Sequence, residues 1–133
     1  MTKQILIIDD EEDSRIFLQT LFGDHGFETL LAHDAAEATE LLASQRPALI
    51  TLDIMMPTQT GLSFYWELRE NPATSEIPVV IVSGFKPWSF KDLHGQNLPE
   101  NQHVVPPDGF VEKPINRREL LDVVRRVLAG RDG

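Results

Sequence analysis

The sequence has no cysteine, few basic residues and no long apolar run, and each absence excludes a class of protein. Without cysteine there are no disulfides, zinc–thiolate sites, iron–sulfur clusters or cysteine nucleophiles. Twelve basic residues against 21 acidic ones give a formal charge of −9. That excess argues against a nucleic-acid-binding protein, which gathers positive charge against phosphates. No apolar run approaches the roughly 20 residues of a membrane helix. We therefore expect neither nucleic acid nor a membrane as partner.

The length of the chain predicts one globular domain. Its 133 residues, 41% of them hydrophobic, fall within the usual range for a single domain. We place the domain at residues 1–129 and a tail at 130–133. No signal peptide is evident, because the first residues lead directly into a strand-like segment. A cytoplasmic location is therefore expected.

Short apolar runs alternate with segments of helical periodicity along the whole chain. Runs that are apolar throughout indicate strands buried on both faces, as in parallel sheets covered by helices. The predicted strands are 5–8, 28–32, 48–52, 78–82 and 109–112, and the predicted helices are 13–25, 35–46, 61–70 and 117–128. This alternation predicts an α/β fold, a flavodoxin-like doubly wound five-stranded parallel sheet with strand order 2-1-3-4-5.

Two of these helices have capping residues at their start. Asp34 can cap the second helix, and Glu37, three residues later, is the reciprocal partner of a capping box. Asn116 and Glu119 have the same spacing at the last helix.

Polar side chains follow the ends of the predicted strands. Asp9 and Asp10 follow the first strand, Asp53 the third, Ser83 the fourth and Lys113 the fifth. Sites of open parallel sheets form at the carboxyl ends of the strands. Any one of these residues could be a solvated loop residue, but the whole set indicates a site.

Three neighbouring carboxylates repel one another, and a hard divalent cation removes the conflict. Magnesium prefers oxygen ligands and needs only one or two carboxylates. The histidines (His25, His33, His94 and His103) are scattered and are interpreted as ordinary surface or loop residues. A carboxylate beside such a cation can act as a nucleophile that forms an acyl phosphate. Asp53 is the best candidate, with Lys113 and Ser83 suited to bind phosphate oxygens.

At these residues the sequence resembles the receiver domains of two-component response regulators, similar in extent to the single-domain chemotaxis type. The matching pieces span nearly the whole chain and occur in the family's order. They are Asp9-Asp10, the run Asp53-Ile54-Met55-Met56-Pro57 with Gly61 beyond it, Ser83, and Phe110-Val111-Glu112-Lys113-Pro114.

The resemblance implies a role for each matching residue. Asp53 would be the phosphoacceptor, supplied by a histidine kinase or a histidine phosphotransfer protein. Asp10, Asp53 and the backbone carbonyl of Met55 would ligate Mg²⁺, and Asp9 would act through water. Lys113 would pair with Asp53 or its phosphate.

The resemblance also implies a switch that alters binding of a downstream protein. Ser83 would move onto the phosphoryl oxygens and Phe110 would swing inward behind it. Gly84 stands beside Ser83 where the family often has alanine, and both residues leave room for a donor. Lys113-Pro114 would be a cis peptide.

One segment departs from the family pattern. The family has a fourth helix between strands four and five, but here residues 85–107 contain Pro87, Pro99, Pro106 and Pro107. Proline at this density breaks helices. We expect a long loop with at most a short helix near 89–93. Trp88 and Phe90 within it either bind a partner or pack back onto the domain.

Two other functions remain as alternatives. A receiver-like interaction module would act without phosphorylation. A phosphatase with an aspartate nucleophile would need a second aspartate two residues after the first, where this chain has Met55. We therefore expect a receiver that promotes its own phosphorylation and dephosphorylation but is not a turnover enzyme. A nucleotide site is disfavoured because the sequence has no glycine-rich phosphate loop.

Overall fold

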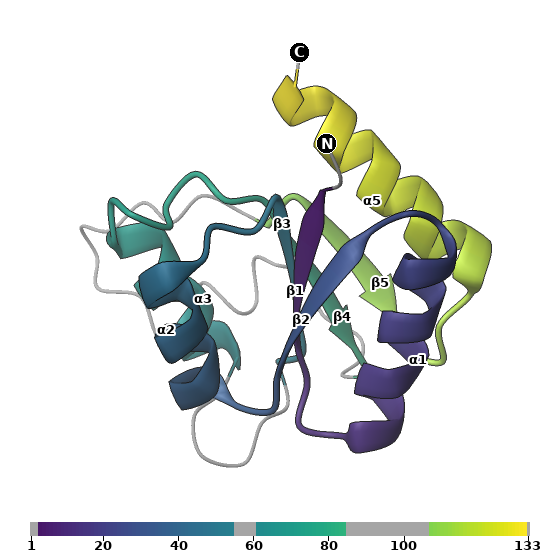
Figure 1. Cartoon of the computed structure of the whole chain (residues 1–133), viewed down its shortest axis with the longest axis horizontal. Coiled ribbons are helices and arrows are strands. Elements are labelled where there is room, and N and C mark those ends of the chain that lie inside the picture. Colours follow the sequence, from purple (N-terminus) through teal and green to yellow (C-terminus); the bar gives the residue numbers. More distant parts are fainter. Residues whose placement is uncertain (1–2, 55–60, 85–106, 133) are drawn as a thin grey trace.

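The computed structural model describes residues 3–54, 61–84 and 107–132, and it has a central parallel sheet with helices on both faces (Figure 1). The element labels are those of Figure 1. In chain order the elements are β1 (Gln4–Ile8), α1 (Glu12–Asp24), β2 (Glu28–Ala32), α2 (Ala35–Ser44), β3 (Leu49–Leu52), α3 (Gly61–Glu70), β4 (Val79–Ser83), β5 (Gly109–Glu112) and α5 (Arg117–Asp132).

The five strands are all parallel and have the order β2-β1-β3-β4-β5. This confirms the predicted flavodoxin-like fold. Helices α2 and α3 lie on one side of the sheet, and α1 and α5 lie on the other (Figure 1). The chain reverses its direction of strand addition after β2, so the carboxyl ends of β1 and β3 are adjacent at the centre of the sheet.

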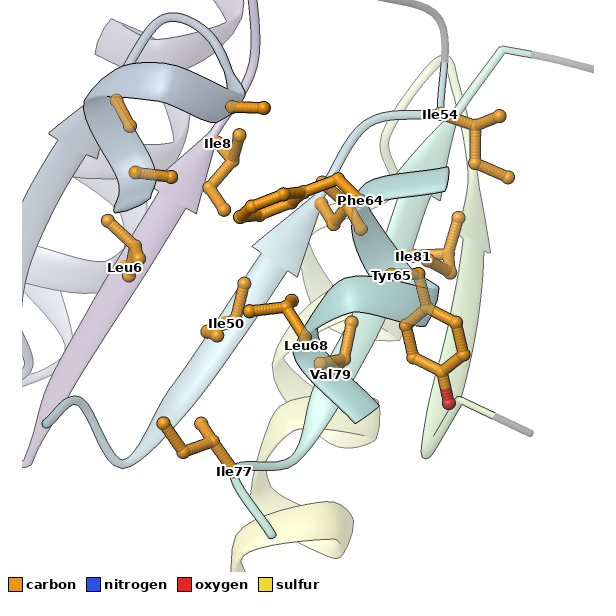
Figure 2. Close-up of a cluster of buried hydrophobic side chains, with 14 residues drawn as sticks. Leu6, Ile8, Ile50, Ile54, Phe64, Tyr65, Leu68, Ile77, Val79 and Ile81 are labelled. Atoms are coloured by element: carbon orange, nitrogen blue, oxygen red, sulfur yellow. The ribbon is translucent and has the colours of Figure 1, made fainter. Parts of the chain in front are cut away.

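Each face of the sheet carries its own apolar core, which explains why the strand runs are apolar throughout. In β1, Leu6 and Ile8 pack toward α2 and α3, whereas Ile5 and Ile7 pack toward α1 and α5. Figure 2 shows the first core, where Phe64 of α3 extends across the sheet. Burying each such side chain stabilises the fold by about 1.5–3 kcal/mol.

The predicted caps are present, but neither capping box has its reciprocal bond among the described residues. The Asp34 carboxylate accepts a hydrogen bond from the backbone N–H of Glu37 at 2.8 Å, and Asn116 accepts one from Glu119 at 3.1 Å. The prediction that the Glu37 carboxylate accepts the backbone N–H of Asp34 was wrong. Glu37 Oε1 instead accepts from the backbone N–H of His33 at 2.8 Å and lies 3.0 Å from its ring Nδ1. The imidazole offers Glu37 a second polar partner there.

The last helix is longer than the sequence predicted. We expected α5 to end near Leu128, but it continues to Asp132 and crosses the boundary predicted at residue 129. Gly26, just beyond the end of α1, has φ +88°, in the left-handed region that terminates helices, whereas Gly130 has no positive φ. A glycine inside a helix costs only about 1 kcal/mol, so Gly130 did not stop the helix.

A buried arginine ties α3 to the amino ends of β4 and β5. The Arg69 guanidinium donates to the carbonyl oxygens of Ser75 at 3.0 Å and Ile77 at 2.7 Å, and to Asp108 Oδ2 at 3.1 Å. The same Asp108 oxygen accepts the backbone N–H of Val79 at 2.9 Å. This network fixes the chain immediately before β5.

Some predictions fall on residues outside the described ones. They concern the loop at 85–107, most of which is not described, the short helix near 89–93, and the Met55 carbonyl. Among the helices that are described, none is both long and apolar enough to cross a bilayer.

Candidate functional site

Three strands deliver the central polar residues to one edge of the sheet. Asp9 follows β1, Asp53 follows β3 and Lys113 follows β5. Backbone hydrogen bonds continue one residue beyond each strand. The N–H of Asp9 donates to Ala32 at 3.1 Å, that of Asp53 to Ile8 at 3.0 Å, and that of Lys113 to Ser83 at 3.0 Å. The sheet itself therefore fixes where these three side chains begin.

The Lys113 ammonium lies among several oxygen atoms. Its Nζ is 2.8 Å from Asp9 Oδ2 and 3.3 Å from Asp53 Oδ2. It also contacts Ser14 Oγ at 3.3 Å and lies 3.5 Å from Glu11 Oε1. Asp9 and Asp53 are only 1% and 3% exposed. The structure thus joins the first, third and fifth strands through one cation.

The surroundings of Lys113 favour its charged form. Burial alone would lower the pKa of this ammonium, but the hydrogen bond and attraction of Asp9, with the attraction of Asp53, outweigh burial and raise the pKa above its ordinary value. An opposite charge at hydrogen-bond distance has this effect on any ionisable group. The Lys113 ammonium is therefore held in its charged form beside Asp53.

The acidic side chains around Lys113 can converge on one point. Asp9, Asp10, Glu11 and Asp53 each offer a carboxylate oxygen, and these four atoms lie within 4.8 Å of one another. Asp9 and Asp53 are buried, while Asp10 and Glu11 are exposed. One ammonium against four carboxylates leaves the cluster with excess negative charge.

Local hydrogen bonds hold the turn that carries these acids. Asp9 Oδ1 accepts the backbone N–H of Glu11 at 2.9 Å, and the Asp9 carbonyl accepts from Arg15 Nη1 at 2.7 Å. Sequence reasoning did not assign Glu11 or Ser14 to the site. Their nearness to Asp9 and Asp10 along the chain was the only available signal, and it does not show which side chains of the turn face Lys113.

This donor set suits magnesium. All four groups supply oxygen and carry charge, and no imidazole or thiolate competes for a softer metal among the described residues. The exposed Asp10 leaves the cluster open on one side, so water or a phosphate oxygen can complete an octahedron.

The structure places the predicted switch residues at the same edge or near it. Ser83 ends β4 and is fully buried, and Phe110 in β5 pairs with Ile81 and is 38% exposed. A Cβ at Gly84 would lie 3.8 Å from Lys113 Cβ, an ordinary contact. Alanine would therefore fit there, and the glycine leaves additional space beside the lysine.

Two further predictions can be compared with the structure. The Lys113–Pro114 peptide bond is cis, as expected. His25 and His33 lie outside the acidic cluster, with their Nδ1 atoms near the Leu21 carbonyl and the Glu37 carboxylate respectively. His94 and His103 lie outside the described residues.

Comparison with known proteins gives consistent matches. A family profile described as "Response regulator receiver domain" matches residues 5–125. The chain is 34% identical over 126 residues to response regulator Rre1 of Synechocystis sp., covering 94% of this chain and 51% of that protein. It therefore spans about half the length of this curated relative and of others that it matches.

Solved structures share the fold. The signal receiver domain of a signal transduction histidine kinase from Syntrophus aciditrophicus superposes with a TM-score of 0.82 at 25% identity, covering 97% of this chain and 92% of that one. Response regulator TrrA from Thermotoga maritima, in complex with Mg²⁺-BeF, gives 0.78 at 25% identity, covering 95% and 99%.

Proposed function

We propose, from the premise that this chain belongs to the response regulator receiver domain family, that Asp53 accepts a phosphoryl group from a phosphohistidine. The donor is a histidine kinase or a histidine phosphotransfer protein. The observation that carries the proposal is the position of Asp53, which is buried, within reach of the Lys113 ammonium and in a cluster of carboxylates with excess negative charge.

In the transfer, a carboxylate oxygen of Asp53 attacks phosphorus and the phosphorus–nitrogen bond of the donor breaks. An acyl phosphate forms on Asp53, and the imidazole leaves with the bonding pair and takes up a proton. Both the nucleophile and the phosphoryl group are anionic, so the Lys113 charge reduces the repulsion between them. Its raised pKa keeps that charge in place.

The acidic residues have a separate task. Asp10, Asp53 and the Met55 carbonyl would hold Mg²⁺ directly, and Asp9 would hold it through water. The bound ion would supply charge neutralisation at the phosphoryl oxygens. Asp9 also has a role that does not depend on the ion. Its carboxylate makes the shortest contact with Lys113 and fixes the ammonium beside Asp53.

Phosphorylation would act as a two-state switch. Ser83 would donate to a phosphoryl oxygen, and Phe110 would turn inward behind it. Ser83 is already at the carboxyl end of β4, and Phe110 is a large aromatic side chain with more than a third of its surface in solvent. An inward rotation would bury apolar area, which favours the inward conformation, and the contact of Ser83 with the phosphoryl group would couple that conformation to phosphorylation. The surface around β5 would then bind a downstream protein.

The protein would thus be a signalling module that gains one phosphoryl group on Asp53 and later loses it. The missing second aspartate at Met55 removes the general acid of an aspartate-based phosphatase. A module that acts without phosphorylation is not favoured, because Asp10, Asp53 and Lys113 are all present and meet at one edge. A cytoplasmic location stays a prediction.

The test is phosphorylation by a small phosphodonor such as acetyl phosphate. Intact-protein mass spectrometry should show the addition of one phosphoryl group in the presence of Mg²⁺ and none with EDTA. Asp53→Asn should abolish the addition, while Asp24→Asn, at the exposed end of α1, should leave it unchanged. A wild-type protein that stays unmodified in Mg²⁺ would contradict the proposal.

A further inference from the structure

Ser14 lies at the phosphorylation site although no part of the receiver motif includes it. It belongs to the first turn of α1 and is half-buried. Its Oγ contacts Lys113 Nζ at 3.3 Å across 99 positions of the chain. Among the described residues that hydrogen-bond this ammonium, Ser14 is the one without charge.

The hydrogen bonds of Lys113 match its donor capacity. An ammonium has three N–H donors and no acceptor. Within the described part of the chain, Nζ makes three hydrogen bonds, to Asp9 at 2.8 Å, Ser14 at 3.3 Å and Asp53 at 3.3 Å. Asp9 and Ser14 precede or begin α1, whereas Asp53 follows β3. Two donors are therefore committed to the α1 side, and the third points to the phosphoacceptor.

We propose that Ser14 is a positioning residue that, together with Asp9, fixes the Lys113 ammonium so that its remaining N–H faces Asp53 and the phosphoryl group attached there. This inference rests on the proposed function. With only Asp9 as an anchor, the ammonium can pivot about a single hydrogen bond. Ser14 adds the second anchor without a charge that would compete with the phosphoryl group for the lysine.

Glu11 does not serve the same purpose. Its carboxylate is 3.5 Å from Nζ, makes an ion pair without a hydrogen bond, and is exposed. Solvent screens such a contact and leaves it weak. The neutral, half-buried hydroxyl is thus the directional partner, and the exposed acid is not.

The test measures beryllofluoride affinity, since this anion mimics a phosphoryl group on a carboxylate. Calorimetric titration in saturating Mg²⁺ should show Ser14→Ala binding the probe about three- to tenfold more weakly, the size expected for the net contribution of one ordinary hydrogen bond. Ser14→Thr retains a hydroxyl and should restore most of the affinity. Ser44→Ala, the same change at the exposed end of α2, should bind like the wild type.

A double-mutant cycle separates positioning from a general structural effect. If Ser14 acts through the ammonium, Ser14→Ala has no further effect when Lys113 is already methionine. An equal loss of affinity in both backgrounds would overturn the proposal. So would unchanged or tighter binding by Ser14→Ala.

A second readout does not depend on phosphorylation. In the unliganded protein, nitrogen-detected NMR of the Lys113 side chain should show slow N–H exchange in the wild type and in Ser14→Thr, and faster exchange in Ser14→Ala. The same exchange rate in all three would overturn the inference. If wild-type protein binds no beryllofluoride but this exchange pattern holds, the proposed function fails while the role of Ser14 stands.

Discussion

The two ends of the sheet each hold a cation, but with different numbers of carboxylates. At the amino ends of β4 and β5, the Arg69 guanidinium pairs with one carboxylate, that of Asp108. At the carboxyl ends, the Lys113 ammonium pairs with three, those of Asp9, Glu11 and Asp53. Both cations are largely buried, with 6% and 17% of their side-chain surface exposed. The two edges therefore differ in charge balance rather than in burial.

This difference separates a structural ion pair from a functional one. Carbonyl oxygens and the Tyr65 hydroxyl accept three further hydrogen bonds from Arg69, and one carboxylate balances its one charge. At the other edge the carboxylates outnumber the cation, and a divalent ion or a shift of Lys113 changes the balance. The predictions below test this contrast in order of decreasing effect.

Removal of Arg69 should have the largest effect on stability. Arg69→Ala removes one donor from Asp108 and one from each of two carbonyl oxygens, and breaking a buried pair from one side costs about 3 kcal/mol or more. Urea unfolding should show this loss. Millimolar Mg²⁺ should stabilise the variant no more than it stabilises the wild type. A larger gain from Mg²⁺ in Arg69→Ala would contradict the contrast between the two edges.

Removal of Lys113 should cost less, and a divalent cation should compensate for it. Lys113→Met leaves Asp9 and Asp53 to repel each other, which should lower the free energy of unfolding in EDTA, but by less than Arg69→Ala because the lysine is the more exposed cation. Mg²⁺ should restore more stability to this variant than it adds to the wild type, since it replaces the lost positive charge. Equal gains for both proteins would show that the ion does not replace the positive charge of Lys113.

The buried hydroxyl of Thr51 is an uncharged control for the two charged edges. Thr51 of β3 is buried, and its hydroxyl has no hydrogen-bond partner among the described residues. Thr51→Val keeps the shape and removes the unsatisfied oxygen, so it should stabilise the domain by about 1 kcal/mol. Thr29→Val on the edge strand β2, which is half-buried, should change stability little. A destabilised Thr51→Val would show that the hydroxyl has an unrecognised partner.

The smallest effect concerns alkaline pH. The pKa of Lys113 is raised in the folded protein, so its contribution to stability is complete below the unfolded-state value, near 10.5, and is lost as the pH rises through the higher folded value. The stability difference between the wild type and Lys113→Met should therefore stay constant up to about pH 10 and shrink as the pH rises above 10.5. A difference that grows over this interval would contradict the assigned direction.

The sequence predicted the fold and the central residues of the site because both depend on local patterns. Apolar runs such as Ile5–Ile8 identify strands buried on both faces, and Asp9, Asp53 and Lys113 occupy the first position after three of them. Parallel strands bring those positions together whatever the details of the loops.

What the sequence could not predict are contacts set by side-chain direction across long separations. Ser14 meets Lys113, and Arg69 meets Asp108, only because the helices pack at particular angles on the sheet. Helix length also depends on context, as Gly130 shows by continuing α5. Glu37 had the spacing of a capping box, yet its carboxylate contacts His33, because the imidazole competes for it.

The most direct test of the account is the location of the phosphoryl group. Borohydride reduction of the phosphorylated protein converts an acyl-phosphate aspartate to homoserine, which peptide mass spectrometry can place in the chain. The account predicts homoserine at position 53 in the presence of Mg²⁺, and none at Asp9, Asp10 or Asp108. Homoserine at another position, or phosphate that resists reduction, would contradict it.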